Sequence, residues 1–405
     1  MRNLAMDNGT ERIPTRVSER ELARRWSAVR AVMADRGLDA LVMQSSNDWL
    51  GGYVKWFTDI PAHNGYPRSV VFYADGHPMS VVEMGPFGGR RVLEGRDPVH
   101  RGVGEILTTP AFLSIAYTHD YEAELVAGAL AAHGCRSIGL VAPGAMPSGF
   151  VEGLRRRLSG HAGFSDATEA VDRLKAIKSE EEIALIRRCA QLQDAVFARV
   201  LEGIRPGMRD VEITALAQHA AQVLGSEQGI FLGSSAPLGQ RSSFLGRHMQ
   251  GRRIQKGDHF SLLIEVNGPG GFYTEIARTI VLGRASQELL DGFAAVKAAQ
   301  EHTLSLIRPG ASCREIAAAH DEWMRAHGLP EEMRLYAHGQ GYDMVERPLI
   351  RADESWTLEA GMCLAVHPGY ETESLFAVIC DNYMVEADGV SACLHATEKR
   401  IFEVC

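Results

Sequence analysis

Apolar and polar residues alternate with two different periods along the first part of the chain. Between residues 21 and 33 apolar side chains recur every three or four positions, which predicts an amphipathic helix. Gly37 follows this pattern and is expected to end the helix. The short apolar run at 40–43 then predicts a strand.

A second apolar run at 69–73 also predicts a strand. It is followed by Asp75-Gly76, a dipeptide typical of tight hairpin turns, so we expect it to pair with residues 79–83. Helical and extended patterns continue to alternate up to about residue 170. The pattern predicts a small α/β domain over residues 1–170, which would accompany a larger one.

The boundary to the second domain carries a helix-start signal. Ser179 precedes a long helical pattern, and Glu182 follows three positions later, so the two side chains can form a capping box. We expect the second domain to occupy residues 171–405.

An internal repeat divides this second domain. Residues 204–213 and 307–316 share six of ten amino acids at an offset of 103 positions. In both segments a helical pattern ends, Pro-Gly turns the chain, and a new helical pattern begins. The repeat predicts a duplicated α+β architecture with two similar halves related by a pseudo-two-fold axis.

Composition narrows the classes of function. The 405 residues carry a net charge of -9, which argues against a nucleic-acid partner, because binding a duplex requires a basic face. The chain shows no apolar run of membrane-spanning length and no apolar leader near Met1, so we expect a cytoplasmic protein without a membrane partner. Its seven cysteines are scattered without a CxxC pair and are expected to be reduced.

Four segments of the second domain carry distinctive motifs: the run from Gly271 to Thr279, His338 in His-Gly-Gln-Gly, the run from Leu358 to Met362, and His367 in His-Pro-Gly-Tyr. Together these segments resemble the creatinase, methionine aminopeptidase and Xaa-Pro dipeptidase superfamily. The resemblance extends over about residues 174 to 400. It implies a pita-bread catalytic domain around a cavity, preceded by a creatinase-like accessory domain, and a homodimer that acts on a small molecule.

The resemblance also implies five positions that hold two metal ions in the family. In this chain they are occupied by Leu263, Glu275, His338, His367 and Cys380. A dinuclear centre needs bridging carboxylates, and the leucine and the cysteine remove two of them. Metal-free acid/base catalysis by the remaining residues is the leading expectation, with no cofactor. The alternative is a single zinc, iron or manganese ion on Glu275, His338 and His367, with Cys380 as a soft fourth ligand or a packing residue.

Other candidates lie near these positions. His248 matches the substrate-facing histidine of the family and is grouped with Glu275, His338 and His367 as catalytic. Glu265 shares a side of its strand with Leu263, so it faces either the cavity or solvent. Five residues are candidates for binding the substrate: Trp56, Phe57, Glu265, Glu346 and Cys380.

The leading functional hypothesis is a hydrolase that cleaves a C–N bond in an amide, amidine or cyclic amidine. Three alternatives remain open. The first is an Xaa-Pro-type metallopeptidase with a mononuclear site, although Val345 stands where a histidine of the family is expected. The others are a lyase resembling dimethylsulfoniopropionate lyase and a non-catalytic pita-bread binding module.

Overall fold

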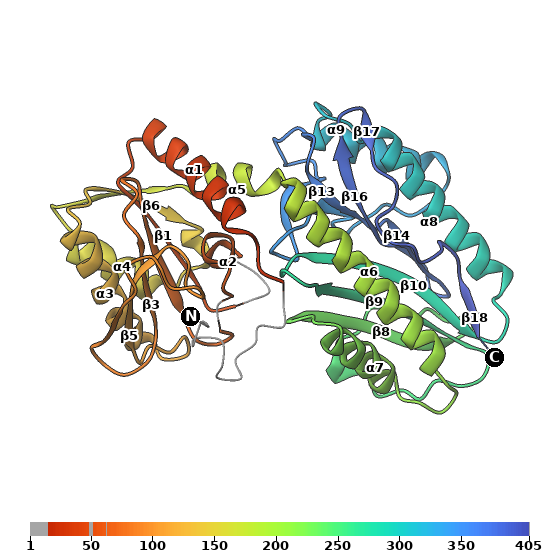
Figure 1. Ribbon diagram of the computed structural model, residues 1–405. Coiled ribbons are helices and arrows are strands. Elements are labelled where there is room, and N and C mark those ends of the chain that lie inside the picture. The colour runs from red at the N-terminus through yellow and green to blue at the C-terminus, as the bar shows by residue number, and fades with distance from the viewer. Residues whose placement is uncertain (1–14, 48–51, 62, 405) are drawn as a thin grey trace, which may run out of the picture. The chain divides into compact units, whose positions relative to one another are not determined.

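The computed structural model of the protein describes residues 15–47, 52–61 and 63–404 (Figure 1). The chain separates into two compact units, one comprising Arg16–Lys175 and the other beginning at Ala176. The sequence analysis placed this boundary at residue 170, a few positions earlier. The two units are named the N-terminal unit and the C-terminal unit below.

The N-terminal unit is built on a seven-stranded mixed sheet with strand order β4-β5-β3-β2-β1-β6-β7. Apolar residues of the sheet and of the helices α3 and α4 form one buried core. The strands are β1 (Ala40–Ser45), β2 (Arg68–Tyr73), β3 (Met79–Met84), β4 (Gly89–Val92), β5 (Val103–Thr109), β6 (Ser137–Val141) and β7 (Gly163–Asp166). The α-helices are α1 (Glu19–Asp35), α2 (Tyr53–Thr58), α3 (His119–Ala132), α4 (Ser148–Arg157) and α5 (Thr168–Ala176).

The predicted local elements of this unit are confirmed. Helix α1 covers the predicted segment, and its first turn is capped by the Ser18 side chain, which accepts a hydrogen bond from the amide of Glu21. Gly37 follows the helix with a positive φ of 62°, a conformation that glycine adopts without strain. Strands β2 and β3 pair antiparallel across the predicted Asp75-Gly76 turn.

The C-terminal unit contains two larger sheets, each associated with a pair of helices (Figure 1). One sheet has the order β18-β10-β9-β8, the other β12-β11-β13-β16-β17, and β14 pairs separately with β15. The helices are α6 (Glu180–Gly203), α7 (Asp210–Val223), α8 (Gln287–Leu306) and α9 (Cys313–Ala326). The strands are β8 (Gly229–Pro237), β9 (Asp258–Asn267), β10 (Tyr273–Leu282), β11 (Ala337–Gly339), β12 (Glu346–Leu349), β13 (Cys363–Val366), β14 (Gly369–Glu371), β15 (Phe376–Val378), β16 (Asp381–Glu386), β17 (Gly389–Val390) and β18 (Phe402–Val404).

This α+β arrangement agrees with the predicted fold, and α6 begins as predicted. Ser179 accepts a hydrogen bond from the amide of Glu182, and the Glu182 carboxylate accepts one from the amide of Ser179. Within the described ranges, no helix combines the length and the apolar character that crossing a membrane requires.

The internal repeat has a structural counterpart. After α6, Gly207 adopts a φ of 91° and donates its amide to the carbonyl of Ile254; after α8, Gly310 adopts a φ of 83° and donates to Leu358. Both turns lead within three residues into the next helix, α7 or α9. The duplicated residues therefore make the same connection in both halves of the unit.

An isolated backbone bridge joins the two large sheets. Ala277 of β10 forms an isolated antiparallel bridge with Cys380, the residue immediately before β16, and its amide donates to the Cys380 carbonyl at 3.3 Å. This junction brings the centre of one sheet next to the start of a strand of the other. The bridge therefore fixes where side chains from the two halves of the C-terminal unit can contact one another.

The N-terminal unit buries one acidic side chain in its core. Glu122 of α3 is almost fully buried and accepts hydrogen bonds from the Gln44 amide at 2.9 Å and from the Ser69 hydroxyl at 2.7 Å. Burial outweighs these two bonds and raises the pKa of Glu122 to about 7. The carboxyl group is thus held partly protonated near neutral pH.

We expect Glu122→Gln to stabilise the protein at pH 8 but much less at pH 5. In the unfolded chain the carboxyl ionises near pH 4.5, whereas in the folded protein it ionises near pH 7, so folding stability falls as pH rises between these values and then levels off. The separation corresponds to roughly 3 kcal/mol at most. Urea unfolding at both pH values measures the difference, with the exposed neighbour Glu124→Gln as control; equal effects of Glu122→Gln at both pH values would contradict the assignment.

Candidate functional site

Two acidic residues face each other at the centre of the β9–β10 ladder. Glu265 lies directly opposite Glu275, and the two side chains are only 5% and 4% exposed. Side chains opposite each other in an antiparallel pair are close enough to interact directly, and these two carboxyl groups share a hydrogen bond. Glu265 therefore faces the site rather than solvent, which settles the alternative left open by the sequence.

Two carboxyl groups this close cannot both be ionised in a dry environment. Burial, and next to it the charge of Glu275, raises the pKa of Glu265 well above its usual range. Burial also opposes ionisation of Glu275, but its pKa is lowered on balance by the imidazoles of His367 and His338 and by hydrogen bonds from Cys380 and Glu265. The pair accordingly holds one proton on Glu265 and the negative charge on Glu275.

Glu275 is held in place by two residues next to the sheet junction. The buried thiol of Cys380 donates a hydrogen bond to Glu275 Oε1 at 2.6 Å. The backbone amide of Glu275 donates to Asn382 Oδ1 at 2.7 Å. These contacts fix the glutamate from the far half of the unit.

Two histidines complete the group. His367 Nε2 lies 3.5 Å from Glu275 Oε1, and the rings of His367 and His338 meet edge to face with centroids 5.2 Å apart. His338 Nδ1 lies 2.9 Å from the carbonyl of Gly339, and because a carbonyl only accepts, Nδ1 carries a proton; in the neutral ring this leaves Nε2 as the acceptor. Burial lowers the pKa of His367 to about 4, so its imidazole is neutral at pH 7.

Sequence reasoning missed two amides that orient the acidic pair. Asn382 Nδ2 donates to Gln340 Oε1 at 2.7 Å, and Gln340 Nε2 donates to Glu265 Oε1 at 3.0 Å. Together they link the backbone of Glu275 to the side chain of Glu265 through fully buried groups. Their position beside His338 and Cys380 in the sequence was the only available signal.

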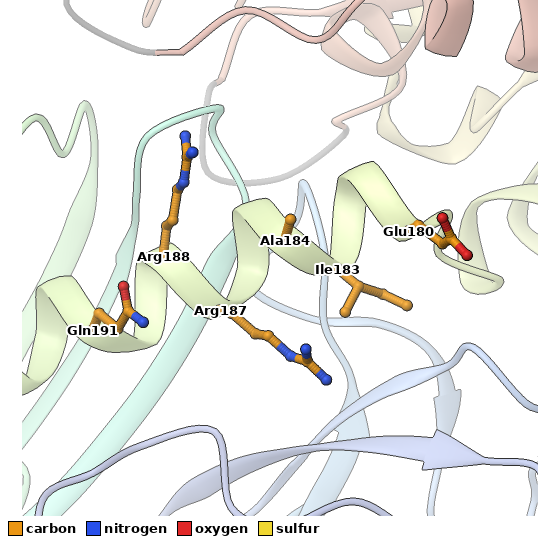
Figure 2. A pocket seen from close by; sticks show the side chains of 6 residues that line it. All are labelled: Glu180, Ile183, Ala184, Arg187, Arg188 and Gln191. Atoms are coloured by element: carbon orange, nitrogen blue, oxygen red, sulfur yellow. The ribbon is translucent and has the colours of Figure 1, made fainter.

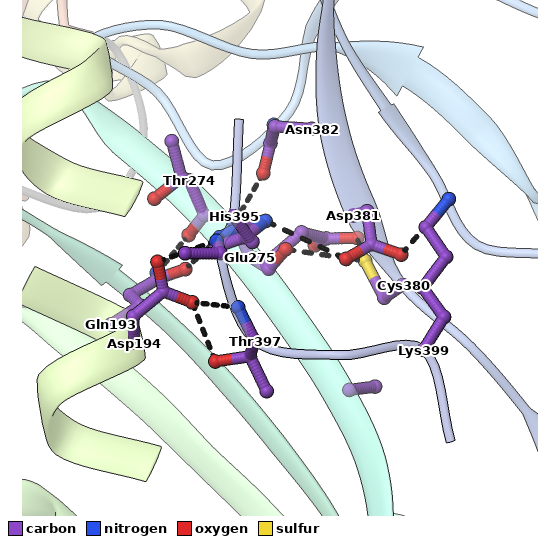
Figure 3. A network of polar contacts seen from close by, with 12 residues as sticks. Gln193, Asp194, Thr274, Glu275, Cys380, Asp381, Asn382, His395, Thr397 and Lys399 are labelled. Carbon is purple, nitrogen blue, oxygen red and sulfur yellow. Dashed lines mark hydrogen bonds and ion pairs between the residues drawn. The ribbon is translucent and has the colours of Figure 1, made fainter. Parts of the chain in front are cut away.

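Behind the site, a buried ion pair anchors the strand that carries Asn382. Arg278 donates to Asp381 Oδ1 at 2.6 Å, and both side chains are inaccessible to solvent. Figure 3 shows Asp381 with His395 and Lys399 beside it. Asp381, Cys393 and His395 also lie close enough for a metal site, but the cations of Arg278 and Lys399 already compensate the carboxylate there.

Three donors of the main site lie within 4.8 Å of one another: those of Glu275, His338 and His367. Two imidazoles and a carboxylate suit a single divalent ion such as zinc, iron or manganese. A second ion would need carboxylates where the chain has Leu263 and Cys380, and burial together with the charge of Glu275 raises the pKa of that thiol well above its usual range. The residues fit one ion and do not fit a dinuclear centre.

Two residues expected to contact the substrate have other partners. Cys380 is completely buried beneath Glu275, so it supports the glutamate instead of touching a ligand. Glu346 forms a buried ion pair of 2.7 Å with Lys178 and accepts a hydrogen bond from the amide of Asp343. A Cβ atom on Gly341 would lie 2.5 Å from this carboxylate, so a larger residue there would displace the Glu346 side chain from its place beside the loop after His338.

The structure does not bring His248 into this group. It lies on an exposed 3-10 turn at Arg247–Met249 and is not among the three donors that converge in the described part of the chain. The sequence match to a histidine of the family could not predict the exposed position of His248, because the path of the loop before β9 decides where its ring lies.

The aromatic pair of the N-terminal unit belongs to its core. Trp56 and Phe57 are 1% and 0% exposed, and Phe57 packs edge to face against both Trp56 and Phe72. Residues 48–51 at the start of their sequence segment lie outside the described residues. The burial of Trp56 and Phe57 favours packing over a role as pocket wall. The homodimer that the family resemblance implies stays a prediction.

A separate depression of about 470 Å³ runs along α6 (Figure 2). Arg187 and Arg188 extend from the helix in different directions there. The depression is lined by Glu180, Ile183, Ala184, Arg187, Arg188 and Gln191. None of the candidate residues contributes to it, so the converging acidic and histidine side chains remain the candidate site.

Known proteins resemble the chain in sequence and in fold. It is 23% identical to the Xaa-Pro dipeptidase of Pyrococcus horikoshii over 273 residues. These residues make up 67% of this chain and 76% of the dipeptidase. It is 25% identical over 393 residues to the creatinase of Bacillus sp. strain B-0618, covering 91% and 87%. The X-Pro aminopeptidase structure from Thermotoga maritima superposes with a TM-score of 0.75 at 16% identity, over 94% of this chain and 99% of that one, which shows a shared fold.

The model of one protein family matches the part of the chain that contains the site. The match runs over residues 184–387, half of the chain, and includes Glu265, Glu275, His338, His367 and Cys380. The protein therefore belongs to metallopeptidase family M24.

Proposed function

We propose that the protein hydrolyses a C–N bond of a small molecule, an amide, an amidine or a cyclic amidine, at the group formed by Glu275, His338 and His367. The observation that carries the proposal is the convergence of these three side chains within 4.8 Å, next to a second carboxyl group. Membership of a peptidase family and the similarity to dipeptidases and to a creatinase support hydrolysis.

In this proposal Glu275 is the general base. Its carboxylate takes a proton from water while the water oxygen bonds to the substrate carbon. His338 Nε2, kept as an acceptor by the Nδ1 hydrogen bond, orients the same water. When the C–N bond breaks, the nitrogen leaves with its electron pair and receives a proton from the acidic pair of Glu265 and Glu275, which Gln340 orients.

One divalent ion on Glu275, His338 and His367 is the alternative that the donor set allows. A bound ion would polarise the substrate and activate water at neutral pH. Glu265 and Cys380 would then act as supports that fix Glu275 in position.

An Xaa-Pro-type metallopeptidase is the second candidate, favoured by the similarity to Xaa-Pro dipeptidases. The position that the family resemblance assigns to a further histidine is Val345, whose side chain is 42% exposed and has no proton to exchange. Turnover of small amides and cyclic amidines beside a set of Xaa-Pro dipeptides separates the two candidates, and turnover of the dipeptides alone would favour the peptidase.

Glu275→Gln is expected to lower turnover by about two to four orders of magnitude, since the amide is nearly isosteric but accepts no proton. Glu265→Gln should cost far less, because an amide can replace a protonated carboxyl that donates a hydrogen bond to Glu275. Steady-state kinetics on the best substrate of the panel measures both, with the exposed Glu398→Gln as control. Near-normal turnover by Glu275→Gln would refute the assignment.

Metal titration should find no more than one divalent ion per chain. Leu263 offers no ligand atom and the Cys380 thiol is used in a hydrogen bond, so a second ion lacks its carboxylates. Calorimetry with Zn²⁺ and Mn²⁺ on chelator-treated protein measures the stoichiometry, and His338→Ala should abolish any binding found. Two ions of similar affinity would show that the site is dinuclear after all.

A further inference from the structure

In the β9–β10 ladder, the cross-strand residue pair next to Glu265 and Glu275 is apolar. Leu263 lies opposite Ala277, two residues along β9 and β10 from Glu265 and Glu275. Side chains two residues apart point to the same face of a strand, roughly 6.7 Å from each other. The face that presents the two carboxyl groups therefore continues directly into hydrocarbon.

This hydrocarbon is part of a defined cluster, called the apolar wall here: Leu263, Ala277, Phe376, Val378, Cys380 and Phe244. Phe244 and Phe376 pack edge to face with ring centroids 5.0 Å apart. The other members form a buried backing, whereas Leu263 and Phe244 are only partly buried. These two side chains are the accessible surface of the wall.

The apolar wall is joined to Glu275 by a hydrogen bond. Cys380 is a member of the wall and donates its thiol hydrogen to Glu275 Oε1. None of the six wall residues carries a charge. On β14, Glu371 lies opposite Phe376 and forms an exposed ion pair with Arg241 at 3.0 Å.

We propose that the substrate places a neutral apolar group, a branched alkyl chain or an aromatic ring, against Leu263 and Phe244 while its C–N bond lies at Glu275. A polar group in that place would lose hydration and gain no hydrogen bond from the wall. The proposal rests on the proposed function and specifies its substrate class. Leu263 is then a specificity-determining residue at a position where the family resemblance expects a metal ligand.

Two substrates of the same shape test the proposal. The p-nitroanilides of isovaleric acid and malonamic acid are both neutral and differ only in replacing an isopropyl group by a carboxamide. We expect the wild-type protein to prefer the isovaleryl compound by about tenfold or more in kcat/KM, the range that a hydrophobic pocket achieves. Leu263→Asn should reduce this ratio severalfold, whereas Leu263→Met, which keeps an apolar side chain of similar volume, should preserve it.

Binding provides a readout that does not depend on hydrolysis. Isovaleramide should bind more tightly than malonamide to the wild-type protein, measured by ligand-observed NMR, and Leu263→Asn should remove the difference. If Leu263→Asn does not fold, Phe244→Gln with Phe244→Leu as its control tests the same wall from another segment. Equal binding of the two amides, preference for malonamide, or binding of neither would overturn the inference. Preferential binding of isovaleramide without hydrolysis of any amide would instead leave the inference standing and refute the proposed function.

Discussion

The sharing of one proton between Glu265 and Glu275 is the constraint on which the site depends. Both side chains come from neighbouring strands of a dry sheet, where two negative charges at this separation would be strongly unfavourable. The surrounding groups resolve the conflict in one direction: the imidazoles of His367 and His338 and the thiol hydrogen bond from Cys380 favour the charge on Glu275. They outweigh the hydrogen bond that Gln340 donates to Glu265, which by itself would favour the charge there. Because these groups come from different segments, the position of the charge is decided only when the whole C-terminal unit is folded.

Sequence patterns predicted the parts of this arrangement that local chemistry determines. Glu275, His338 and His367 lie in motifs with distinctive neighbours, and the structure brings all three together. The capping box at Ser179 and the two Pro-Gly turns were recognisable because helix ends have local hydrogen-bonding requirements.

The remaining features depend on register and on packing between distant segments. Whether Glu265 faces the site is decided by the turn between β9 and β10, where Gly270 and Gly271 adopt positive φ angles and set which residues stand opposite each other. Cys380 and Trp56 have side chains whose types suit a site or a core equally well, so only burial distinguishes the two. His248 shows the reverse case, in which a matching position in the sequence lies on an exposed turn.

The buried pair of Arg278 and Asp381 also constrains how the C-terminal unit can move. Separating β10 from the start of β16 would leave the charges of Arg278 and Asp381 buried without a partner, which costs far more free energy than breaking a surface ion pair. Hinge-like opening between β10 and β16 is therefore suppressed, and the two halves of the C-terminal unit keep a fixed position relative to each other. Any adjustment to ligands of different size falls to side-chain rotation and to the connecting loops, so the catalytic geometry is kept while selectivity can vary.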